Sequence, residues 1–145
     1  VFKINPDDIR AKKVVVIGCG NGAEVHEFAR MDARCVMGID LTDSITDAAR
    51  NTDNFDNVLI MQADAVKPPM LSESVDVLYC DGVLPHTQHP KEFLYEILKL
   101  LKPGGEALIR TLLVPESLRS RLHLLPRQMV RTLTKRLPSN MLWKI

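Results

Sequence analysis

Residues 14–22 read Val-Val-Val-Ile-Gly-Cys-Gly-Asn-Gly, and Asp40 follows 18 positions after the last of these glycines. The four apolar, β-branched residues at 14–17 predict a buried parallel strand. Three glycines at alternate positions then predict a tight turn, and residues 23–30 continue with a helical pattern. Such a turn points backbone N–H groups at a ligand. Because an acidic residue about 20 positions later is typical of a carboxylate that accepts ribose hydroxyls, this stretch predicts a site for a nucleoside-containing ligand.

Strand and helix patterns alternate along the rest of the chain. Pro68-Pro69 breaks the third connection, and Lys102-Pro103-Gly104-Gly105 is expected to end the last helix of the alternation. The alternation predicts an α/β fold, namely a doubly wound, mainly parallel sheet with helices on both faces. We expect strands at 14–17, 35–39, 58–61, 75–80 and 106–112, and helices at 23–31, from a cap at Thr42 or Asp43 to about 50, and from Pro90 to about 101.

Charge and hydropathy divide the chain at about residue 115. The 145 residues carry a net charge of +1, but residues 116–145 hold +6 and the first 115 hold −5. Apolar residues, mostly leucines, recur every three or four positions after residue 116, with arginines between them. We therefore expect a ligand-binding core at 1–115 and a basic amphipathic helical segment at 116–145.

The three cysteines lie in apolar or glycine-rich runs at Cys19, Cys35 and Cys80. Their spacing matches neither a disulfide framework nor a metal site, so we expect no metal and reduced thiols in the cytoplasm. No apolar run reaches the roughly 18 residues that a membrane span needs.

The glycine turn by itself leaves the ligand open. Gly18-x-Gly20-x-x-Ala23 satisfies the dinucleotide pattern G-x-G-x-x-G/A, and Gly18-x-Gly20-x-Gly22 equally satisfies the turn that binds S-adenosylmethionine. Further segments, taken in order, decide between the two: residues 38–42, 63–69, 75–87 and 101–105. Together with the turn, they resemble class I S-adenosylmethionine-dependent methyltransferases, especially the small-molecule group of ubiquinone and menaquinone type. The resemblance covers about 13–111.

This resemblance implies S-adenosylmethionine as the cofactor and assigns residues of the first motif to it. Gly18, Cys19, Gly20 and Gly22 would form the turn beside the methionine and ribose portions. The physical reason for glycine there is space, because a Cβ would occupy the ligand's volume. The family usually has an acidic residue two positions before the first glycine, where this chain has Val16.

The resemblance assigns the nucleoside to the next two motifs. Asp40 would accept both ribose hydroxyls, and Leu41 would lie against the adenine. Asp64 would accept from the adenine amino group, while the N–H of Ala65 would meet a ring nitrogen.

The fourth motif would supply the reacting end of the site. Cys80 and Asp81 would border the methionyl group, and His86 is the candidate general base where the acceptor must lose a proton. Asp81 is the alternative base. The family often has two histidines where this chain has Pro85-His86.

We therefore expect S-adenosylmethionine-dependent methyl transfer to a small-molecule or lipid-like acceptor. The alternatives are a non-catalytic S-adenosylmethionine-binding domain or truncated fragment, and an NAD-dependent oxidoreductase. We expect no nucleic-acid partner, because the net positive charge is confined to 116–145 and aromatics are few. Residues 116–145 would begin a substrate-covering insertion, or contact a membrane or lipid. We also expect the last two strands of the family's seven-stranded sheet to be lacking; the oligomeric state stays open.

Overall fold

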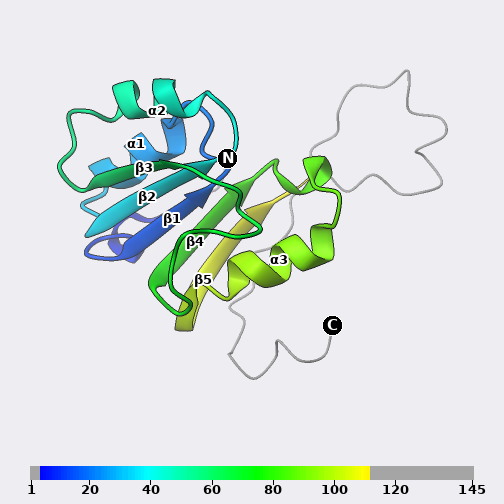
Figure 1. The fold of residues 1–145 in the computed structure, drawn as a ribbon. Coiled ribbons are helices and arrows are strands. Elements are labelled where there is room, and N and C mark those ends of the chain that lie inside the picture. Colours follow the sequence, from blue (N-terminus) through cyan, green and yellow to red (C-terminus); the bar gives the residue numbers. More distant parts are fainter. Residues whose placement is uncertain (1–3, 112–145) are drawn as a thin grey trace, which may run out of the picture.

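The computed structural model describes residues 4–111, which form one twisted sheet covered by helices (Figure 1). All strand pairs are parallel, and the strand order is β3-β2-β1-β4-β5. The strands are β1 (Lys13–Ile17), β2 (Cys35–Asp40), β3 (Val58–Gln62), β4 (Val75–Asp81) and β5 (Leu101–Arg110). The predicted α/β fold with a doubly wound parallel sheet is confirmed.

Helices cover both faces of the sheet, as predicted (Figure 1). Helices α1 (Ala23–Arg30) and α2 (Ile45–Asn51) lie on one face, and α3 (Pro90–Leu98) lies on the other. Two short 3₁₀ helices complete the elements, η1 (Pro6–Asp8) and η2 (Leu84–His86). No helix within residues 4–111 is long and apolar enough to cross a membrane.

Strand β1 is the centre of the sheet and contributes to both hydrophobic cores. Its residues 14–17 are each at most 1% exposed. Val14 and Val16 pack with α1 and α2, while Val15 and Ile17 pack with α3. A strand that is buried on both faces needs apolar side chains at every position, which explains the uninterrupted run in the sequence.

The boundary between α3 and β5 differs from the prediction. Helix α3 ends at Leu98, and β5 begins at Leu101 instead of Glu106. Leu101 pairs with Val75 and Glu106 pairs with Val77, so residues 102–105 bulge out opposite a single residue of β4. Pro103 has no N–H for a ladder bond and Gly104 has a φ of 80°, so the Pro-Gly-Gly turn makes a bulge inside the strand.

Three expectations about the C-terminal part concern residues outside those described. They are the basic helical segment at 116–145, the domain boundary beside it, and the absence of two final strands.

The two-sided core gives a direct test of stability. Ile97 of α3 is completely buried, whereas Leu71 is 81% exposed. Replacing Ile97 by alanine should lower the free energy of unfolding by about 2–5 kcal/mol through lost contacts and a cavity. The matched variant Leu71→Ala should change it by less than about 0.5 kcal/mol. Urea unfolding measures both, and equal losses would contradict this placement of the core.

Candidate functional site

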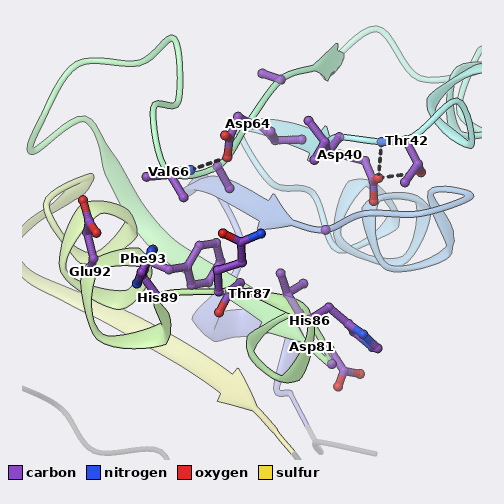
Figure 2. Close-up of a pocket in the computed structure, with 18 residues that line it drawn as sticks. Asp40, Thr42, Asp64, Val66, Asp81, His86, Thr87, His89, Glu92 and Phe93 are labelled. Atoms are coloured by element: carbon purple, nitrogen blue, oxygen red, sulfur yellow. Dashed lines mark hydrogen bonds between the residues drawn. The ribbon is translucent and has the colours of Figure 1, made fainter.

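A cavity of about 700 Å³ opens at the carboxyl ends of the central strands. At this point the strand order reverses, because β2 lies on one side of β1 and β4 lies on the other. Open parallel sheets bind ligands at this point. Figure 2 shows Asp64 and Val66 on one side of the cavity and Thr87, His89, Glu92 and Phe93 on the other. Its lining comes from five segments of the chain: Gly18, residues 39–42, residues 63–66, residues 81–83, and residues 86–89 with Glu92 and Phe93.

The carboxylate of Asp40 lies at the end of β2 and holds two loops together. Its Oδ2 accepts a hydrogen bond from the Gly20 N–H at 2.8 Å. Its Oδ1 accepts from the Thr42 N–H at 2.9 Å and from the Thr42 hydroxyl at 2.7 Å (Figure 2). Burial by itself raises the pKa of this carboxyl, but the hydrogen bonds from Thr42 and Gly20 outweigh it, so the pKa of Asp40 lies below its ordinary value.

Thr42 therefore supports the carboxylate, and the expectation that it or Asp43 caps α2 is wrong. The N-cap is Ser44, without a side-chain capping bond. The Thr42 hydroxyl lies 2.5 Å from the Ser44 hydroxyl as well as bonding Asp40. The Thr42 hydroxyl donates its hydrogen to the Asp40 carboxylate, and this charge-assisted bond is stronger than one between neutral groups.

The remaining acceptor capacity of Asp40 fits a ribose. A carboxylate offers about four lone-pair positions, and the three bonds from Gly20 and Thr42 occupy three of them. One hydroxyl can therefore bind directly, and a second can bind when the Thr42 hydroxyl turns to Ser44.

Asp64 and its neighbours lie at the other end of the cavity wall. Asp64 Oδ1 accepts from the Val66 N–H at 2.9 Å, which leaves Oδ2 without a bond among residues 4–111 (Figure 2). Leu41 is 67% exposed, and both it and Ala65 line the cavity. An apolar side chain, a free carboxylate oxygen and a backbone segment suit the flat, polar-edged ring of an adenine.

The three glycines of the turn have different neighbours, so the expectation that a ligand's volume explains all three needs a correction. A Cβ on Gly18 would lie 2.2 Å from Val83 Cγ2, and one on Gly22 would lie 2.9 Å from the Ala48 Cα of α2. A Cβ on Gly20 would meet nothing within 4 Å. Close packing of this chain therefore requires glycine at two positions, and Gly18 is the only one of the three that lines the cavity.

Cys19 and Cys80 were expected in the site, but neither lines the cavity. Both side chains are buried, and burial raises the pKa of each thiol to about 12. Protonated thiols are poor nucleophiles, so these cysteines serve as packing residues. Val16, the position of the family acid, is also buried and packs in the core under α1.

Beyond the end of β4, the cavity brings Asp81 and His86 together (Figure 2). Both line the cavity as expected, but the Asp81 carboxylate is paired with Arg110 of β5. The sequence reading missed Arg110, because it lies in a strand recognised by its apolar residues. It also missed Thr87, Gln88, Glu92 and Phe93 as lining residues, although Pro90 placed a helix start beside them.

Comparisons with known proteins agree with this geometry. The methyltransferase-domain family matches residues 15–109. The chain is 30% identical over 122 residues to a ubiquinone biosynthesis O-methyltransferase of Neisseria meningitidis, covering 81% of this chain and 50% of that protein. It is 29% identical over 111 residues to a tRNA U34 carboxymethyltransferase of Pseudoalteromonas translucida, covering 74% and 34%. This chain thus spans half or less of the length of these relatives.

Solved structures show the same fold. The YcgJ protein of Bacillus subtilis superposes with a TM-score of 0.69 at 25% identity, over 74% of this chain and 47% of that one. A SAM-dependent methyltransferase of Aquifex aeolicus superposes with a TM-score of 0.66 at 19% identity, over 74% and 63%.

The lowered pKa of Asp40 predicts a pH-dependent contribution to stability. A carboxyl whose pKa is lower in the folded chain stabilises the fold fully above its unfolded pKa of about 4, and loses this effect as the pH falls through the folded pKa. Asp40→Asn should therefore lower the free energy of unfolding at pH 7, and the difference from wild type should shrink as the pH falls below about 4. Urea unfolding across this range measures it; a pH-independent difference would contradict the prediction.

Proposed function

Because this chain belongs to the methyltransferase-domain family, for which S-adenosylmethionine is the cofactor, we propose that it transfers a methyl group to a hydroxyl of a small-molecule acceptor. The observation that carries the proposal is one cavity that joins Asp40 and Asp64 to His86. The side of the cavity with Asp40 and Asp64 supports a nucleoside site, and His86 on the same cavity supports a base within reach of it.

The chain's own residues bind and align the reactants in this mechanism. S-adenosylmethionine would supply a methyl group on a sulfonium. The acceptor oxygen attacks the methyl carbon, so an O–C bond forms as the S–C bond breaks, and the thioether S-adenosylhomocysteine leaves. Asp40 holds the ribose hydroxyls and Asp64 accepts from the adenine amino group. An imidazole nitrogen of His86 takes the proton from the acceptor hydroxyl. Alignment of the two reactants within this cavity supplies much of the rate.

The choice of a small acceptor rests on charge and on the relatives. The first 115 residues carry a net charge of −5, which opposes the phosphate backbone of an RNA. Ubiquinone biosynthesis O-methyltransferases are among the relatives at 30% identity. The tRNA U34 carboxymethyltransferases have similar identity to this chain. An RNA acceptor is therefore the alternative that the activity test must include.

A non-catalytic S-adenosylmethionine-binding domain is the second candidate. Val16 favours this candidate, because a buried valine stands where the family usually has an acidic residue before the glycine turn. A cytoplasmic location and a lipid or membrane contact through 116–145 also stay as proposals; the three free cysteines support the first.

Cofactor binding is tested by titration calorimetry with S-adenosylhomocysteine. Asp40→Ala should raise the Kd about 10–100-fold, because hydrogen bonds to a charged group are lost. Asp47→Ala is the matched control, since this aspartate pairs with Arg50 on the exposed side of α2, and it should leave the Kd unchanged. Tighter binding of NAD than of S-adenosylhomocysteine would overturn the cofactor assignment.

The role of His86 is tested by turnover with labelled S-adenosylmethionine on a panel of phenols and catechols, with unmodified tRNA as a further arm. His86→Gln should lower kcat about 10²–10⁴-fold and leave S-adenosylhomocysteine binding intact. His89→Gln is the control, because His89 also lines the cavity, and it should retain kcat. Methylation of tRNA alone would contradict the acceptor class, and binding without turnover would favour the non-catalytic domain.

A further inference from the structure

We propose that Arg110 is a positioning residue, which fixes the loop at 82–87 and with it the place of His86 in the cavity. Its effect on turnover rests on the proposed function, but its effect on the loop does not.

The first support is the side-chain pair between Arg110 and Asp81. The Nε of Arg110 donates to Asp81 Oδ1 at 2.5 Å, and its Nη2 donates to Asp81 Oδ2. The Tyr79 hydroxyl donates to the same Oδ2 at 3.5 Å. The two side chains are only 20% and 18% exposed, so water screens the pair less than it screens a surface ion pair. A two-point contact of this kind fixes orientation as well as distance.

The second support is a main-chain bond from the same residue. The Gly82 N–H donates to the Arg110 carbonyl at 2.9 Å, and Asp81 faces Arg110 in the last register pair of β4 and β5. Arg110 therefore holds two consecutive residues, one through its side chain and the next through its backbone. These residues are the point at which β4 ends and the cavity loop begins.

The loop then leads from this anchor to His86 through short contacts. Val83 packs against Gly18, where there is no room for a Cβ. The His86 N–H donates to the Val83 carbonyl at 2.9 Å, and the Thr87 N–H donates to the Leu84 carbonyl at 3.2 Å. Since both bonds connect residues 86 and 87 to residues 83 and 84 at the start of the loop, a shift at Asp81 would move His86.

The pair also removes Asp81 from the candidate bases. Both of its carboxylate oxygens accept from the Arg110 guanidinium, which stays protonated at all relevant pH values. Proton transfer to Asp81 would break a two-point ion pair, so Asp81 serves as the point at which Arg110 holds the loop, and His86 is left as the base at this end of the cavity.

The opposite end of the same two strands offers a matched control. The Lys102 Nζ lies 2.8 Å from Asp76 Oδ1, and this pair also links β5 to β4. It is more exposed, at 39% and 25%, and lies at the end of the strands away from the cavity. A role that consisted only of joining two strands would be shared by both pairs.

The experiment compares Arg110→Gln, Arg110→Lys and Lys102→Gln in the full chain by amide hydrogen exchange. In Arg110→Gln, the His86 and Thr87 amides should exchange about tenfold faster or more, because charge-assisted bonds are lost. In Lys102→Gln, the same amides should change by less than about twofold. Arg110→Lys should restore only part of the protection, because a lysine keeps the positive charge but cannot donate to both Asp81 oxygens in the planar geometry of a guanidinium.

Turnover gives the second readout. Arg110→Gln should lower kcat about 10–100-fold through misplacement of His86, with little change in the KM for S-adenosylmethionine. Unchanged exchange at His86 and Thr87 in Arg110→Gln, or equal changes in Lys102→Gln, would overturn the proposal. Faster exchange in a chain that binds no S-adenosylhomocysteine would instead overturn the proposed function and leave the positioning role standing.

Discussion

The carboxylate of Asp40 is the contact on which the site depends. It accepts from Gly20 after β1 and from Thr42 after β2, while the Gly18 and Cys19 N–H groups donate to the Ile39 carbonyl beside it. The glycine turn is thus bonded to the end of the neighbouring strand before any ligand arrives. This arrangement keeps the carboxylate charged and correctly placed, which reduces the ordering that binding would otherwise cost.

The sheet explains why these groups meet. Strand β1 lies between β2 and β4, so the loops that follow it and its two neighbours share one edge. Two hydrophobic cores hold β1 from both faces, and rigid strands position polar groups more precisely than mobile loops do. On the β4 side of this edge, the pair of Asp81 and Arg110 fixes the loop that carries His86, just as the hydrogen bonds of Asp40 fix the glycine turn.

Much of this could be predicted from sequence, because local patterns carry it. The buried run at 14–17, the glycines and Asp40 lie within one short stretch, and periodicity placed the strands and helices. The pair of Asp81 and Arg110 could not be predicted, because it joins residues 29 positions apart through the register of β4 and β5. The neighbours of Gly18 and Gly22 are equally nonlocal, so the sequence could not show that Val83 and Ala48 leave no room for a Cβ at these positions.

A crystal structure of this chain with S-adenosylhomocysteine tests the central claim most directly. The account predicts ribose hydroxyls on the Asp40 carboxylate, the adenine between Leu41 and Asp64, and the thioether sulfur facing His86. A ligand bound outside this cavity, or a ribose that does not contact Asp40, would contradict it.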